Sequence, residues 1–174
     1  MPDPRLPTLR SCLLALGLLG SAGTLPAQAP SVAAMDSLLG CMAGHWLMTG
    51  TVRGKPATYR LDVERVLRGR FIELHMEDVS QPSAYEARVF LGVDSAKAQY
   101  VAHWLDNTGA GYSIPHATGD ARGDTIHVTF PYPEQAFSDT FVYDRSADAW
   151  HFRLEAADGH GGWTLFAEYR VHRR

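Results

Sequence analysis

From Gly44 to the end of the chain, apolar and polar residues alternate in short runs that are separated by turns. In one such run Tyr59, Leu61 and Val63 occupy every second position, and charged residues stand between them. A period of two places successive side chains on opposite faces of a strand, so each run predicts a half-buried strand. Clusters of Gly, Pro, Asn and Asp between the runs predict turns. The pattern therefore constrains the chain to an all-β fold.

The runs predict about ten strands, joined by connections too short for the crossovers that parallel strands need. A sheet of ten amphipathic strands must curl, and closure removes its exposed edges. We expect a single antiparallel up-and-down β-barrel. A β-sandwich is the alternative, and the even spacing of the runs favours the barrel. The expected strands are 46–53, 59–64, 72–77, 85–91, 100–105, 112–114, 125–130, 137–144, 150–155 and 163–172, with a hairpin loop at 119–124.

One short helix is predicted before the first strand. Apolar residues within 32–43 recur at spacings of three and four, which places them on one helical stripe, and Gly44 ends the pattern. We expect this helix to plug or flank the barrel, with Trp46 forming the barrel floor. The stripe comprises Val32, Met35, Leu38, Leu39 and Met42.

The first residues resemble a secretory signal peptide rather than part of the fold. Two arginines precede an apolar stretch at 12–19, and Ala27-Gln28-Ala29 has the small-x-small pattern of a signal-peptidase site. Pro30 is a poor residue after a cut, so cleavage near Ala27 or a few residues later is an alternative. We expect a signal peptide at 1–29 and one domain at 30–174, exported to the periplasm or the extracellular space.

Composition excludes several partners of the mature domain. Removing 1–29 takes one acidic and two basic residues from totals of 19 and 16, which leaves a formal net charge of −4. This charge argues against nucleic acid and anionic membranes as partners. No later segment approaches the ~20 continuous apolar residues of a transmembrane helix. Cys41 remains as a single cysteine, which we expect to be buried on the helix; lipidation at a cleavage box formed by 38–41 is the alternative.

The order of several short motifs resembles the calycins, the group of lipocalins, fatty-acid-binding proteins and their bacterial relatives. Gly44-His45-Trp46 after a short helix resembles their G-x-W opening. The stretches 91–94, 100–106 and 108–111, then Gly119 and the tail 163–168, are similar to secreted bacterial calycin-like proteins of unknown function.

The resemblance implies a barrel around a small cavity and no particular ligand. Lipocalins also pair their opening tryptophan with a late basic residue, a role that Arg170 or Arg173 would take here, although Arg170 has outward parity.

Because the outside of a barrel in water must be polar, the aromatic-rich face of the strands is expected inside. An interior of ten strands leaves room for a small ligand, and tyrosine and indole groups suit a ligand that is apolar or amphipathic. A filled aromatic core is the alternative. Asp139 is the carboxylate of inward parity, expected to orient a ligand with a raised pKa unless a bulge turns it outward. The expected ligand-binding residues are Trp46, Tyr59, Met76, Tyr85, Tyr100, Trp104, Phe130, Asp139, Phe141 and Trp150, with Tyr143 and Trp163 also inward.

Motifs for catalysis or metal binding are missing from the sequence. His103, His127 and His151 have outward parity, and no H-x-H, H-E-x-x-H or cysteine cluster occurs, so we expect no metal and no cofactor. No serine stands in a nucleophile elbow, so no catalytic residue is assigned. The related nitrobindins hold haem through a histidine near the chain end, where His172 stands here.

Three functions are therefore open. The favoured hypothesis is a secreted barrel that binds a small, largely apolar molecule in an aromatic cavity. The second is an enzyme on the same barrel, either an isomerase or a haem-dependent type, that uses a histidine or Asp139. The third is a structural envelope protein whose barrel is filled.

Overall fold

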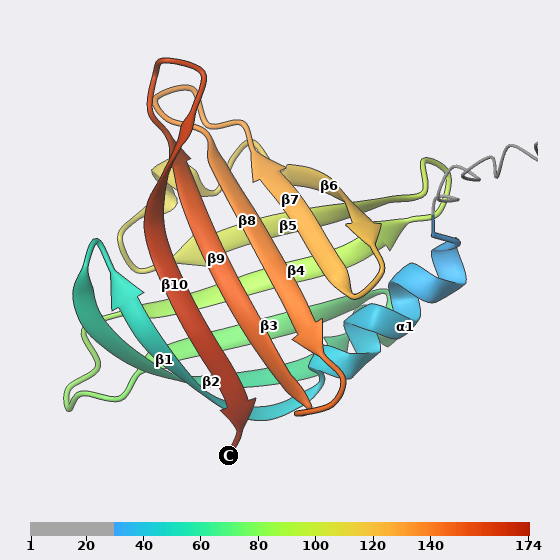
Figure 1. The fold of residues 1–174 in the computed structure, drawn as a ribbon, viewed down its shortest axis with the longest axis horizontal. Helices are drawn as coiled ribbons and strands as arrows, with labels where there is room; N and C mark the ends of the chain where they lie inside the picture. Colours follow the sequence, from blue (N-terminus) through green and yellow to red (C-terminus); the bar gives the residue numbers. More distant parts are fainter. Residues whose placement is uncertain (1–29) are drawn as a thin grey trace, which may run out of the picture.

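The computed structural model describes residues 30–174, which form a closed antiparallel barrel of ten strands with one α-helix before the first strand (Figure 1). Each strand pairs with its neighbours in the chain, and β10 pairs with β1 to close the barrel. The predicted fold class is thus confirmed, while the predicted signal peptide lies outside the described residues. The strands are β1 (Gly44–Val52), β2 (Lys55–Val66), β3 (Phe71–Asp78), β4 (Glu86–Asp94), β5 (Gln99–Asp106), β6 (Ala117–Arg122), β7 (Thr125–Phe130), β8 (Phe137–Asp144), β9 (Ala149–Ala157) and β10 (Trp163–Arg173).

The sixth strand lies where the sequence predicted a hairpin loop. Residues 112–114, expected to be a short strand, are not one: position 112 ends a short 3-10 helix, η2 (Ala110–Tyr112), and β6 begins only at Ala117. The inward positions of β6 are Ala117, Gly119 and Ala121, which give no strong apolar signal. A Cβ added to Gly119 would lie 1.8 Å from the His127 carbonyl oxygen, so the close approach of β7 requires glycine there. A small-residue strand thus has the composition of a turn.

A β-bulge in β10 corrects the expected position of Trp163. The pairing of β10 with β9 shifts between Leu165 and Ala167, so Phe166 is an extra residue. An inserted residue reverses the faces of everything on one side of it. Trp163 is therefore 45% exposed on the outer wall rather than inside, whereas Tyr169, beyond the bulge, is buried.

Helix α1 (Val32–Met42) packs across one end of the barrel, as expected for a plug (Figure 1). The Ser31 side chain caps its first turn, and Met35, Leu38, Leu39 and Met42 are buried. Two barrel residues bind its backbone: the Tyr100 hydroxyl donates to the Met35 carbonyl at 3.0 Å, and Trp46 Nε1 donates to the Met42 carbonyl at 2.7 Å. Cys41 is half-buried on this helix. Among residues 30–174, no helix is both long and apolar enough to cross a membrane.

Gly44, Trp46 and Arg173 form the closing contact of the barrel. The Arg173 guanidinium lies 3.8 Å from the centroid of the Trp46 ring and donates to the Ala43 carbonyl at 2.8 Å. Asp148 holds the same guanidinium through Nε at 2.9 Å. Gly44 has φ of +134°, and a Cβ there would lie 2.1 Å from Arg173 Nη1, so both backbone and space require glycine. The late basic partner of Trp46 is thus Arg173, and the closed barrel fits a calycin-like fold.

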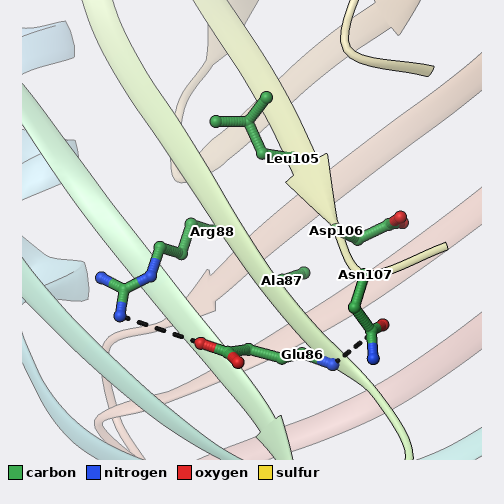
Figure 2. Close-up of a pocket in the computed structure, with 6 residues that line it drawn as sticks. All are labelled: Glu86, Ala87, Arg88, Leu105, Asp106 and Asn107. Carbon is green, nitrogen blue, oxygen red and sulfur yellow. Dashed lines mark hydrogen bonds and ion pairs between the residues drawn. The ribbon is translucent and has the colours of Figure 1, made fainter. Parts of the chain in front are cut away.

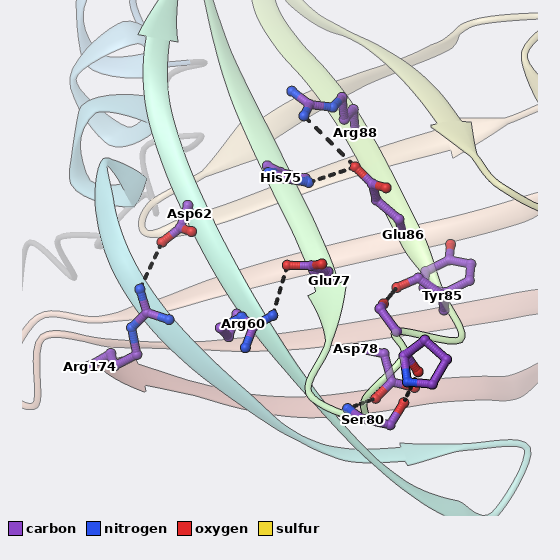
Figure 3. A network of polar contacts seen from close by, with 12 residues as sticks. Arg60, Asp62, His75, Glu77, Asp78, Ser80, Tyr85, Glu86, Arg88 and Arg174 are labelled. Carbon is purple, nitrogen blue, oxygen red and sulfur yellow. Dashed lines mark hydrogen bonds and ion pairs between the residues drawn. The ribbon is translucent and has the colours of Figure 1, made fainter.

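The outer wall of β2, β3 and β4 is a ladder of charged pairs (Figure 3). Arg60 contacts Glu77 at 2.9 Å, and His75 contacts Glu86 at 2.9 Å, with Arg88 3.8 Å from the same Glu86. Exposed pairs of this kind contribute roughly 0.2–1 kcal/mol each. Their main effect is to keep this face in water, which leaves the apolar face of the same strands inside.

Candidate ligand-binding site

The barrel encloses a cavity of about 470 Å³. Its lining comes from the strands and from the turns after β1, β5 and β7, and no α1 residue takes part. The cavity therefore lies toward the end of the barrel away from the helix. Its size is within the range of about 300–1,000 Å³ that is typical of small-molecule sites.

Seven of the ten predicted site residues line this cavity, and three do not. Trp46, Tyr100 and Trp150 are also inward but lie in the packed end below α1, each at most 2% exposed. Trp46 and Tyr100 bind the helix backbone, and Trp150 stacks on Tyr143 with ring centroids 4.8 Å apart. These three therefore support the floor of the barrel instead of lining the cavity. The seven lining residues are Tyr59, Met76, Tyr85, Trp104, Phe130, Asp139 and Phe141.

A chain of aromatic rings runs along one side of the cavity. The centroid of Phe130 is 6.3 Å from that of Trp104 and 5.4 Å from that of Tyr132, on which it stacks. Phe137 continues the chain, 6.3 Å from Tyr132 and 5.2 Å from Phe166. We call these five residues the aromatic belt. Their apolar rings supply most of the surface that a ligand would cover on this side.

Several lining residues were not predicted from the sequence. Tyr132 lies in a Pro-Tyr-Pro turn, and Phe166 is the bulge residue, so alternation gave no signal for either. Tyr169 did alternate inward, and its aromatic side chain was the available signal. The Arg53 guanidinium lies at the β1–β2 turn, 5.0 Å from the centroid of the Phe166 ring. Gln135 adds one amide from the β7–β8 turn.

A polar cluster surrounds Asp106 on the wall of the cavity. The Tyr85 hydroxyl and Trp104 Nε1 both donate to Asp106 Oδ2, at 3.1 and 3.2 Å. The other carboxylate oxygen accepts the Thr108 backbone N–H at 2.9 Å. Burial, together with the nearby Asp106 carboxylate, raises the pKa of Tyr85 far above its ordinary value. Tyr85 therefore remains a neutral hydrogen-bonding group, and the oxygens of Asp106 are already engaged.

Tyr59 and Tyr169 extend this polar wall. The Tyr59 ring lies 5.8 Å, centroid to centroid, from both Tyr85 and Tyr169 in edge-to-face contacts. Burial raises the pKa of Tyr59 and of Tyr169, which keeps both phenols protonated. The wall thus presents neutral hydroxyl groups beside aromatic surface, an arrangement suited to a ligand with apolar and polar parts.

Asp139 differs from the other polar groups of the lining because one of its carboxyl oxygens is buried without a hydrogen-bond partner among the described residues. It lies on β8 between Val128 of β7 and Leu154 of β9, and its side chain is inward as the alternation predicted. The residue is 2% exposed, and its Oδ1 has no hydrogen-bond partner among the described residues. Burial raises the pKa of this carboxyl to about 8. A buried polar atom without a partner calls for a structural or functional explanation, and ligand recognition is one.

A second, smaller hollow of about 200 Å³ lies outside the barrel, between β4 and β5 (Figure 2). Figure 2 shows two polar contacts beside it: Asn107 Oδ1 accepts the Glu86 backbone N–H at 3.3 Å, and Arg88 lies 3.8 Å from the Glu86 carboxylate. We assign no ligand to this hollow.

The histidines lie outside the cavity. His127 contacts the Ser138 hydroxyl at 2.9 Å, and His151 contacts the Glu168 carboxylate at 2.9 Å. His172 is exposed on β10 and does not line the cavity. It is therefore not placed to bind a haem inside the barrel. Within residues 30–174, no group of three or more His, Cys, Asp or Glu side chains is placed to hold a metal ion.

Comparison with known proteins gives no assignment for this chain. No protein-family model matches it. A search of curated proteins also returns no match. Function must therefore be argued from the geometry of the barrel.

Proposed function

We propose that this protein is an exported, calycin-like barrel that binds a small, largely apolar molecule in its aromatic cavity. The observation that carries the proposal is the cavity of about 470 Å³. Protein interiors are close-packed, and voids larger than a water molecule are few. A barrel with only a structural role has no need of such a volume, so the cavity disfavours the filled-barrel alternative.

The lining also favours binding over catalysis. Among the described lining residues, Asp139 is buried between Val128 and Leu154, and no histidine, cysteine or serine faces it there. A nucleophile with an adjacent base is therefore not formed around this carboxyl. The aromatic belt and the tyrosine wall supply surface and hydrogen-bonding groups, which are the features of a ligand pocket.

The test compares one substitution at two positions. Trp104 faces the cavity, whereas Trp163 lies on the outer wall and provides a matched control. An environment-sensitive apolar dye should bind the wild type, and Trp104→Ala should weaken that binding at least tenfold. Trp163→Ala should bind dye as the wild type does. Melting curves of all three proteins show whether each remains folded.

Two outcomes decide the matter. If wild-type protein binds no dye and Trp104→Ala loses about 3–5 kcal/mol of stability, the ring fills a core and the binding proposal fails. If dye binding is lost while the melting temperature falls little, the ring lines an open site. Native mass spectrometry of protein expressed in its own host should then show a co-purified small molecule.

A further inference from the structure

We propose that the ligand carries a protonated amine, which forms an ion pair with Asp139 inside the cavity. This inference deepens the proposed function and rests on it. It concerns the chemical class of the ligand: an apolar body with one cationic nitrogen, as opposed to a fatty acid or a neutral hydrocarbon.

The first argument is the unsatisfied carboxyl itself. Val128 and Leu154 flank Asp139 in the barrel wall, and neither side chain can donate a hydrogen bond. Its Oδ1 has no partner among the described residues, although the residue is 2% exposed. Burying such a group is costly unless a donor or an opposite charge meets it. A ligand ammonium supplies both.

The second argument is the charge of the lining. The titratable groups that line the cavity are four tyrosines, the carboxyls of Asp106 and Asp139, and the guanidinium of Arg53. Arg53 is exposed at the β1–β2 turn and lies over the Phe166 ring. Asp106 is already held by Tyr85, Trp104 and Thr108, so Asp139 is the lining carboxyl that has an unpaired oxygen among the described residues. An anionic head group placed deep in this cavity would meet two carboxyls and no cation.

The third argument is the position of Asp139 relative to the rings. Asp139 stands two residues from Phe137 on β8, so both side chains are on the inner face. Its charge raises the pKa of Tyr132 and of Tyr169, after the larger effect of burial on each, so both phenols lie within electrostatic reach. Aromatic faces attract cations, and this attraction strengthens where water is excluded. An ammonium at Asp139 therefore gains from both the carboxylate and the rings.

The experiment uses three probes that share one alkyl chain: decylamine, decanol and decanoate. Isothermal titration calorimetry measures their binding to the wild type, to Asp139→Asn, and to Glu155→Gln as a control that removes one carboxylate from the outer face of β9. Decylamine should bind the wild type at least tenfold more tightly than decanol does. Asp139→Asn should abolish that preference and leave decanol binding unchanged, whereas Glu155→Gln should preserve it.

Proton linkage provides a readout that a merely structural role would not give. An ammonium stabilises the ionised carboxyl, so decylamine binding near pH 7 should release a proton from Asp139. The binding heat should then vary with the ionisation heat of the buffer in the wild type, and this variation should disappear in Asp139→Asn.

The possible outcomes distinguish a failure of the amine proposal from a failure of the proposed ligand-binding function. If decanol and the dye bind but decylamine binds no more tightly, the amine inference is overturned and the binding function stands. If decanoate binds most tightly and Arg53→Gln weakens it, the ligand is an anion held at the mouth, and the inference is again overturned. If neither decanol nor the dye binds the folded wild type, the proposed function itself fails.

Discussion

The pH dependence of stability gives a direct measure of how deeply Asp139 is buried. Its pKa is raised from 3.8 to about 8 by desolvation. Between these values the folded protein retains a proton that the unfolded chain has lost. The stabilising effect of this raised pKa is therefore complete below about pH 4 and is lost as the pH rises toward 8. The slope is about 1.4 kcal/mol per pH unit, so the free energy of unfolding should fall by on the order of 3 kcal/mol between about pH 5 and pH 7.

The assay is urea unfolding of the wild type and Asp139→Asn at about pH 5, 6 and 7. Comparing the two proteins at each pH cancels the contribution of every titratable group that they share, so the remaining pH dependence comes from residue 139. Relative to the wild type, the free energy of unfolding of Asp139→Asn should increase by on the order of 1 kcal/mol for each pH unit. Glu155→Gln, which removes an outer carboxylate, should show no such gain.

A difference that stays constant from pH 5 to pH 7 would refute this reasoning. It would mean that water or a cation reaches the carboxyl in the ligand-free protein, and that the carboxyl ionises at its ordinary pKa. A direct titration of the Asp139 carboxyl carbon by NMR provides an independent check, because it requires no variant and no unfolding.

The remaining predictions concern the floor and the seam of the barrel. Trp46→Ala should cost about 3–5 kcal/mol in denaturant unfolding, the range for a buried large aromatic; a loss below about 1 kcal/mol would contradict its role as the floor. Gly50→Ala should lower the unfolding free energy by about 1–3 kcal/mol or more, because the added Cβ would lie 1.9 Å from the Glu168 carbonyl oxygen across the seam. Arg173→Ala should lower the free energy of unfolding by about 2 kcal/mol, since it removes a cation–π contact and an ion pair to Asp148. An unchanged midpoint of denaturant unfolding would show that these contacts contribute no net stability.

The alternation of apolar and polar residues was enough to predict the fold class and the inward-facing residues of most strands. Tyr59 and Leu61 of β2 follow it without interruption, and so do the inward residues of β8. It failed where the inner residues are too small to be read as apolar, as at Ala117 and Gly119 of β6. Small side chains are required there because β7 approaches closely, and that cause is visible only in three dimensions.

The sequence predicted which residues of the candidate site point into the barrel, but not how far along the barrel axis each of them lies. Parity placed Trp150 and Asp139 on the same inner surface, although the first packs below the helix and the second lines the cavity. Depth depends on where each strand begins relative to its neighbours, which is set by pairing across strands rather than along one chain. The inward position of Phe166 could not be predicted for a related reason, since a bulge is a property of two paired strands.

The contact between Arg173 and Ala43, 130 positions apart in the chain, has a consequence for the order of folding. Every other strand pairing joins neighbours in the sequence, so it can form by successive hairpins, whereas the β1–β10 seam must wait for all of them. Loop closure over such a separation is slow. Until it occurs, the nearly complete sheet has two unpaired edges, and each edge can pair with that of another molecule. Refolding at high protein concentration should therefore divert chains into strand-exchanged oligomers.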